Sequence, residues 1–94
     1  MIKVAYDRKA LELTVSGHAC AASYGFDVVC AGVSTLVFTL MHELIRRNIP
    51  HERSLKPGYA KVKGEGGREC FDCVATGLML LAENYPGAVE FGEG

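Results

Sequence analysis

The sequence predicts an α+β fold of the order ββαββαβ, with an antiparallel or mixed sheet packed against two helices. Five short segments carry apolar residues at every second position or are rich in strand-forming residues. Of two longer segments, the first is apolar on nearly every face and the second carries apolar residues at three- and four-residue spacing. Glycine or proline separates most of these segments. A chain of 94 residues has room for one domain, so we treat residues 1–94 as a single domain.

The first two strands are predicted to form a hairpin. Met1–Tyr6 alternates apolar residues with Lys3 and Ala5, and the segment 11–15 alternates leucine and valine with polar residues. The polar run Asp7-Arg8-Lys9 stands between them as a turn. Gly17 ends the second strand, because glycine permits a sharp change of chain direction.

A long helix is predicted to follow a loop. Residues 19–26 are mostly small, which is typical of a loop, and Asp27 is a good N-cap for a helix from Val28 to about Arg47. Apolar residues occupy nearly every face of its first three turns, which predicts burial in the domain or in a dimer interface. The apolar stretch from Val28 to Met41 is shorter than a bilayer requires, so we expect no membrane association.

The second half of the chain repeats the order of two strands and a helix, then adds a strand. Glu52–Lys56 and Tyr59–Lys63 are predicted strands around Pro57-Gly58, the signature of a type II turn. A second helix is predicted from Glu69 to Asn84 by its apolar spacing. Ala88–Phe91 is predicted to be an edge strand.

Composition and charge limit the classes of function. Hydrophobic residues make up 49% and charged residues 22%, which excludes disorder as the main state. The net charge of −1 disfavours a strongly basic nucleic-acid binder, although residues 46–69 hold seven basic and three acidic side chains. Only one aromatic residue, Tyr59, lies in this segment, so we interpret it as a solvated face rather than an RNA-stacking surface. The start of the chain carries no secretory signal, and we therefore expect a cytoplasmic protein with reduced cysteines.

The segment from Ser16 to Ser34 holds the residues best suited to chemistry. His18 follows a predicted strand, and Cys30 falls in the first turn of the predicted helix. Unpaired amides and a partial positive charge at that end favour the thiolate, which is the nucleophilic form. A neighbouring imidazole would take the thiol proton. The loop between them would then close over a substrate, with Tyr24 or Phe26 lining a pocket.

Each of these residues also has a plainer interpretation. The pattern alone favours Cys30 as a buried core cysteine and His18 as a surface or capping histidine. Asp27 is an N-cap first, and its functional role would be to orient His18. Ser34 either hydrogen-bonds the site or bonds back to the carbonyl of Cys30. The residues alone leave both interpretations open.

A motif adds to this argument. The run Gly-His-Ala-x5-Gly-x-Asp-x2-Cys-Ala-x-Val-Ser, from Gly17 to Ser34, resembles the bacterial ribosomal-processing cysteine protease family Prp. The resemblance is weaker over the rest of the chain. It implies that His18 and Cys30 are the catalytic dyad and that Asp27 and Ser34 support it. The positions taken as the substrate loop are Ala19, Cys20, Ala21, Ala22, Ser23, Tyr24, Gly25 and Phe26.

The resemblance also implies an activity and partners. It implies a homodimeric cysteine endopeptidase that removes the N-terminal extension of a large-subunit ribosomal protein, with a peptide segment of that precursor as its substrate. It implies no organic cofactor and no metal, and direct nucleic-acid binding is not required. The alternative is a noncatalytic ribosome- or RNA-associated module whose cysteines are structural.

Two cysteines outside the motif form a single C-x2-C. Cys70 and Cys73 are too few for a zinc site, which needs four ligands, and the remaining ligands would have to come from elsewhere in the chain. A redox pair is a second alternative, although a glycine-rich loop precedes it rather than the usual strand. The plainer interpretation is that Cys73 packs in the core and Cys70 is partly exposed.

Overall fold

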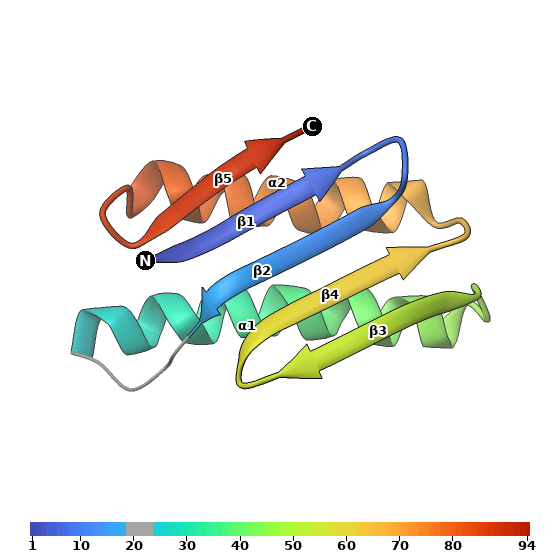
Figure 1. Ribbon diagram of the computed structural model, residues 1–94, viewed down its shortest axis with the longest axis horizontal. Helices are drawn as coiled ribbons and strands as arrows, with labels where there is room; N and C mark the ends of the chain where they lie inside the picture. The colour runs from blue at the N-terminus through green and yellow to red at the C-terminus, as the bar shows by residue number, and fades with distance from the viewer. Residues whose placement is uncertain (19–23) are drawn as a thin grey trace.

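One five-stranded sheet with two helices on a single face makes up the fold (Figure 1). The computed structural model describes residues 1–18 and 24–94, and for His18 and residues 24–27 it describes the backbone alone. The elements are β1 (Ile2–Asp7), β2 (Glu12–His18), α1 (Tyr24–Arg46), β3 (His51–Lys56), β4 (Gly58–Gly64), α2 (Arg68–Asn84) and β5 (Val89–Glu93). The predicted α+β class and the order ββαββαβ are therefore confirmed.

The sheet is mixed, with the strand order β3-β4-β2-β1-β5. Its neighbours pair antiparallel except β1 and β5, which run parallel. The predicted last strand is thus an edge strand, as expected. In β1, Ile2, Val4 and Tyr6 are buried while the residues between them are exposed, so one face of the sheet carries the core.

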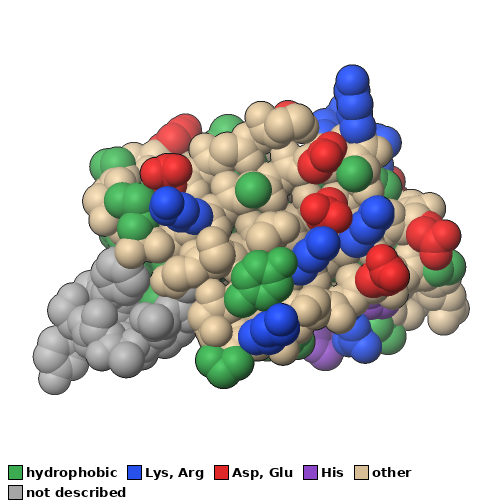
Figure 2. Space-filling model, viewed as in Figure 1, with side chains coloured by type: hydrophobic (Ala, Val, Ile, Leu, Met, Phe, Trp, Pro, Cys, Tyr) green, Lys and Arg blue, Asp and Glu red, His purple; other side chains and the backbone are tan. Residues whose placement is uncertain are grey.

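The opposite face of the sheet is open to solvent and mixed in charge. Figure 2 shows basic and acidic side chains interspersed over it. Lys61 on β4 lies 3.5 Å from Glu12 on β2, which is one such pairing of opposite charges. On this face the basic residues of segment 46–69 form no single-sign surface, which favours their interpretation as a solvated face.

The turn between β3 and β4 has the predicted chemistry. Gly58 has a φ of +73°, the left-handed value that a type II turn requires at the position after proline. In the first hairpin, the Asp7 carboxylate accepts hydrogen bonds from the amides of Lys9 and Ala10, both at 3.1 Å. Local side-chain bonding therefore closes the turn that the polar run predicted.

The two helices run antiparallel and approach closely through glycines. A Cβ on Gly77 of α2 would lie 2.9 Å from the nearest methyl carbon of Leu36 on α1. A Cβ on Gly32 would lie 3.4 Å from a methyl carbon of Leu81. At the other end of the pair, Arg47 donates a hydrogen bond of 3.1 Å to Glu69. These contacts fix the end of α1 beside the start of α2.

The first helix begins earlier than the sequence predicts. It starts at Tyr24 rather than Val28, so Asp27 lies inside the helix and the N-cap prediction is wrong. The segment Val28–Arg46, at 19 residues and a mean hydropathy of 1.8, is also longer than the apolar stretch considered above. By length and composition it is able to cross a membrane, but in this fold Val33, Leu40 and other side chains of the helix lie in the core.

Candidate active site

Gly17 makes β2 irregular just before the candidate histidine. The pairing of β2 with β4 shifts register between Ser16 and His18, which marks a β-bulge. Gly17 has a φ of +74°, and a Cβ there would overlap the carbonyl oxygen of Met1. Glycine in this conformation is the typical first residue of a G1 bulge, which redirects the residues that follow. Both the backbone angle and the neighbouring strand therefore require glycine.

His18 is the last residue of β2. Its backbone pairs with Gly58, the first residue of β4. In Figure 1 the end of β2 overlies the N-terminal half of α1. Five residues, 19–23, connect the strand to the helix and lie outside the described residues. That segment holds the first five of the expected substrate-loop residues: Ala19, Cys20, Ala21, Ala22 and Ser23. The loop prediction is wrong for Tyr24, Gly25 and Phe26, which are helical.

Cys30 lies in the second turn of α1, not in its first turn as predicted. The unpaired amides of a helix belong to its first turn, and the effect of the helix dipole falls off over the same distance. The helix end is therefore a weaker source of thiolate stabilisation than the sequence implied. The Cys30 side chain is fully buried and belongs to the hydrophobic core, beside Val29 and Val33 in the chain.

Ser34 lies one turn after Cys30 on the same side of α1 and is half-buried. Its neighbour Thr35 bonds back to the carbonyl of Ala31 at 2.8 Å, and Thr39 bonds back to Thr35 at 2.6 Å. Thr35 and Thr39 are both exposed, so their hydroxyls lie on the solvent side of the helix, away from the buried thiol of Cys30. The roles of Ser34, Asp27 and His18 in catalysis stay predictions.

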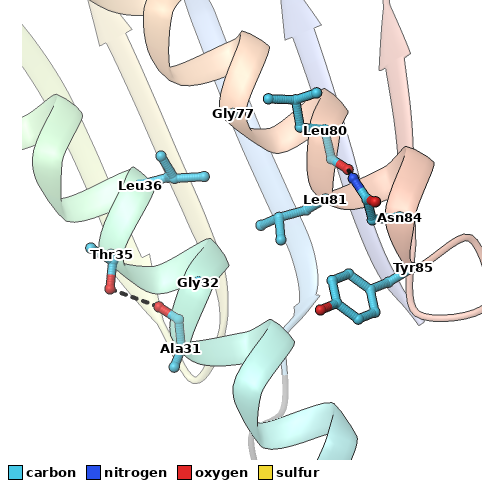
Figure 3. Close-up of a pocket in the computed structure, with 9 residues that line it drawn as sticks. All are labelled: Ala31, Gly32, Thr35, Leu36, Gly77, Leu80, Leu81, Asn84 and Tyr85. Carbon is cyan, nitrogen blue, oxygen red and sulfur yellow. Dashed lines mark hydrogen bonds between the residues drawn. The ribbon is translucent and has the colours of Figure 1, made fainter.

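A groove between the helices was not anticipated from the sequence. It has a volume of about 620 Å³ and lies between α1 and α2 on the side away from the sheet (Figure 3). Leu36, Leu81 and Tyr85 point into it from the two helices (Figure 3). Ala31 and Gly32, which directly follow Cys30, form part of its wall. Leu80 on α2 and Tyr85 just after it line the groove and are exposed, but exposure is a property of the folded chain, so no sequence signal pointed to the groove.

A hydrogen-bonded cluster joins the β1–β2 hairpin to α2. The buried Tyr6 hydroxyl donates to Asp72 at 2.8 Å, and Arg8 donates to both oxygens of the same carboxylate. Burial, followed by the bond to Asp72, raises the pKa of Tyr6. The bonds from Arg8 and then Tyr6 lower the pKa of Asp72. Arg68 adds a bond to the carbonyl oxygen of Arg8, so the cluster is saturated and we interpret it as structural.

Metal ligands do not gather in the described part of the chain. Among residues 1–17 and 28–94, whose side chains the structure describes, no three Cys, His, Asp or Glu side chains lie close enough to hold a metal ion. Cys70 is buried and Cys73 is exposed, the reverse of the packing expected for this pair.

Comparison with known families decides the class of protein. The family model described as cysteine protease Prp matches residues 1–90. The chain belongs to this family. The resemblance seen in the motif is thereby confirmed, and the protein is a cysteine protease. No curated protein matches it.

Solved structures share the Prp fold with this chain. The crystal structure of SMU.848 from Streptococcus mutans has 27% sequence identity and a TM-score of 0.80, covering 98% of this chain and 90% of that one. The essential ribosomal processing protease Prp from S. aureus, in complex with a substrate peptide, has 16% identity and a TM-score of 0.84, covering 99% and 97%. A second S. aureus Prp structure, with a covalently linked product peptide, has 16% identity and a TM-score of 0.80, again covering 99% and 97%.

Proposed function

We propose that this Prp protein removes the N-terminal extension of a large-subunit ribosomal protein, with Cys30 as nucleophile and His18 as its general base. Membership of the Prp family supports the protease chemistry. The observation that supports the site is the bulge at Gly17, which redirects β2 immediately before His18, the last residue before the short connection to α1, the helix that holds Cys30.

The mechanism follows from these two groups. His18 takes the proton of the Cys30 thiol, and the thiolate attacks the scissile carbonyl of an extended peptide. The protonated imidazole then donates that proton to the leaving amine, and water hydrolyses the thioester. Because Cys30 lies in the second turn of α1, the imidazole supplies more of the thiolate's stabilisation than the helix end does. Asp27 and Ser34 support the dyad.

The buried thiol has a consequence for this mechanism. Cys30 is 0% exposed, so a peptide reaches its sulfur only after atoms that cover it have moved. Substrate binding and exposure of the nucleophile are thus linked steps. A small uncharged alkylating reagent should therefore react more slowly at Cys30 of the folded protein than at an unfolded cysteine.

The substrate class rests on the relatives. The S. aureus structures carry substrate and product peptides of a ribosomal processing protease, and one of the peptides is covalently linked. A peptide from a ribosomal precursor is the corresponding substrate here, met in the cytoplasm where thiols stay reduced.

The proposed active form is a homodimer. Val28, Phe38 and Ile45 on α1 are 67%, 48% and 46% exposed, an unusual solvent exposure for large apolar side chains on one helix. Sedimentation analysis tests this: wild type should sediment as a dimer, and Phe38→Asp should shift it toward monomer. Wild type that sediments as a monomer at assay concentration overturns the dimer.

Cleavage of the precursor tests the function. The source organism's own precursor is incubated with wild type, Cys30→Ala or Cys73→Ser, and the products are read by intact mass. One cut near the N-terminus by wild type and Cys73→Ser, absent with Cys30→Ala, is the expected result. If folded wild type leaves an extended precursor intact, the noncatalytic ribosome-associated module becomes the better account.

A further inference from the structure

Two cysteines of this chain have no part in the proposed mechanism. Cys70 and Cys73 are the third and sixth residues of α2. Cys70 is 7% exposed and Cys73 is exposed, and neither is in a disulfide. They lie at the far end of the helix pair from Cys30, because α1 and α2 are antiparallel and the start of α2 contacts the end of α1.

The spacing places the two thiols on one side of the helix. Residues three apart on an α-helix have Cβ atoms roughly 5–6 Å apart. A disulfide needs Cβ atoms about 3.5–4.5 Å apart, so this pair requires only a small contraction.

The pair lies in the first two turns of α2, close to its N-terminal end. The carbonyl of Gly67 accepts from the amide of Cys70 at 2.9 Å and from the amide of Phe71 at 3.1 Å, so Cys70 belongs to the turn that begins the helix. Helix ends adjust their geometry more readily than the helix body does. A contraction between Cys70 and Cys73 is therefore easier here than further along α2.

The two thiols also share one hollow in the surface. A recess of about 360 Å³ between α1 and α2 is lined by both cysteines together with Arg47, Glu69 and Leu40. Burial raises the pKa of the Cys70 thiol, and the Arg47 guanidinium opposes this only in part. The buried Cys70 is therefore a poor target for an oxidant in solution, while the exposed Cys73 meets it directly.

We propose that Cys70 and Cys73 are a peroxide-sensitive dithiol that closes to a disulfide within α2. Hydrogen peroxide oxidises the Cys73 thiol to a sulfenic acid, and the peroxide is reduced to water. The Cys70 sulfur then attacks the sulfur of that sulfenic acid, a sulfur–sulfur bond forms, and the hydroxyl leaves as water with the Cys70 proton. Two thiols have lost two electrons and two protons in total, and peroxide has accepted them.

Reversibility follows from the geometry. The disulfide must hold its Cβ atoms closer than the α-helix does, and one of its sulfurs starts exposed. Strained or exposed disulfides are the readily reduced ones. A thiol reductant should therefore restore both cysteines, whereas sulfinic or sulfonic acids would resist it.

The trypsin sites of the chain place Cys70 and Cys73 in a different peptide from the other two cysteines. Trypsin cuts after Arg68 and frees residues 69–94, which hold Cys70 and Cys73 and no further Lys or Arg. Cys20 and Cys30 fall together in the separate peptide 10–46. The folded protein is titrated with hydrogen peroxide, denatured, alkylated with iodoacetamide and digested, with and without dithiothreitol before alkylation. Fragment spectra then distinguish cysteine oxidation from sulfoxide at Met79.

The expected result is loss of both alkylation sites in peptide 69–94, without oxygen on either cysteine and with full recovery after dithiothreitol. In Cys73→Ser, Cys70 should stay alkylatable at the same peroxide dose. In Cys70→Ala, Cys73 should stop at the sulfenic acid and be trapped by dimedone. The proposal is overturned if Cys73 of the wild type takes up oxygen while Cys70 stays alkylatable, or if neither cysteine reacts. The peptide analysis of oxidised wild-type protein is sufficient to decide whether the disulfide forms. A variant that fails to fold therefore does not remove the test.

Discussion

At the scale of the residue, Gly17 is the position that the site depends on most. It has a left-handed backbone angle and a neighbouring strand that leaves no space for a side chain. The sequence predicted that this glycine turns the chain before His18. It did not predict the second reason, because contact with Met1 arises only when β1 and β2 pair.

Gly17→Ala should therefore lower both stability and activity. The left-handed angle costs about 1–2 kcal/mol for an L-residue, and overlap with Met1 adds to it, so we expect a loss of roughly 3 kcal/mol in the free energy of unfolding. Displacement of His18 should reduce the cleavage rate about 10²-fold. Urea denaturation and a peptide-cleavage assay measure the two effects.

Gly58→Ala is the matched control. Gly58 has nearly the same φ, +73°, but a Cβ added there would meet no atom of the described residues within 4 Å beyond its chain neighbours. It should lose only the conformational part, about 1–2 kcal/mol. Equal losses for the two variants would show that the contact with Met1 has no energetic weight.

Asp72 is the second residue with a testable role, as the hydrogen-bond acceptor of the Tyr6 hydroxyl. Asp72→Ala leaves the Tyr6 hydroxyl without its acceptor in a buried site, which should cost about 1–3 kcal/mol. Tyr6→Phe should then cost less in the Asp72→Ala background than in wild type, since the bond is already lost. A double-mutant cycle by urea denaturation measures the coupling, and additive losses would contradict the bond.

Cys30 shows what a sequence pattern leaves out. The motif identifies the residue, but its depth in the core depends on how α1 lies on the sheet. The plainer interpretation, a buried cysteine, and the functional one are thus compatible. The same residue is buried in the described structure and is the proposed nucleophile.

At the scale of the element, the start of α1 was placed too late because Asp27 is a strong N-cap signal. An acidic residue is also favoured within the first turn, where it interacts with the helix dipole. The same residue type therefore fits two positions only a few residues apart. Boundaries of the other elements agree with prediction within about two residues, because turns with glycine or proline mark most of them.

The contact between the helices gives an element-scale prediction. Gly32→Ala should raise the free energy of unfolding by about 0.5–1 kcal/mol, because alanine favours a helix and a Cβ there lies 3.4 Å from Leu81. Gly77→Ala also increases helix propensity, but its Cβ would lie 2.9 Å from a methyl carbon of Leu36, a distance too short for two carbon atoms. Thermal unfolding should rank Gly32→Ala above Gly77→Ala, and the reverse order would contradict this packing.

At the scale of the whole molecule, the fold class was predictable because each element has a clear period and the turns between them have specific chemistry. The order of the strands in the sheet was not predictable, because the parallel pairing of β5 with β1 depends on where α2 returns the chain. The groove between the helices was missed for a similar reason, because it arises only where two helices meet.

Acid should weaken the whole molecule through its carboxylates. Hydrogen bonds from Arg46 and then Arg47 lower the pKa of Glu43 to about 2, from an ordinary value of 4.5. Because the pKa of Glu43 is lower in the folded state than in the unfolded state, ionised Glu43 stabilises the folded protein at pH values above 4.5. This contribution is lost as the pH falls from 4.5 toward 2. Glu43→Gln should therefore be less stable than wild type at neutral pH, and the difference should disappear near pH 2. Urea midpoints across this range measure it, and a difference independent of pH would contradict the ion pairs.

Covalent trapping of the nucleophile tests directly whether Cys30 is the catalytic cysteine. The protein is treated with a chloromethyl ketone built on its cleavable peptide, digested with trypsin and mapped by mass spectrometry. We expect one adduct per chain, on Cys30 in peptide 10–46, and none on Cys70 or Cys73. An adduct on another cysteine of a chain that cleaves its substrate would contradict Cys30 as the nucleophile of this protease.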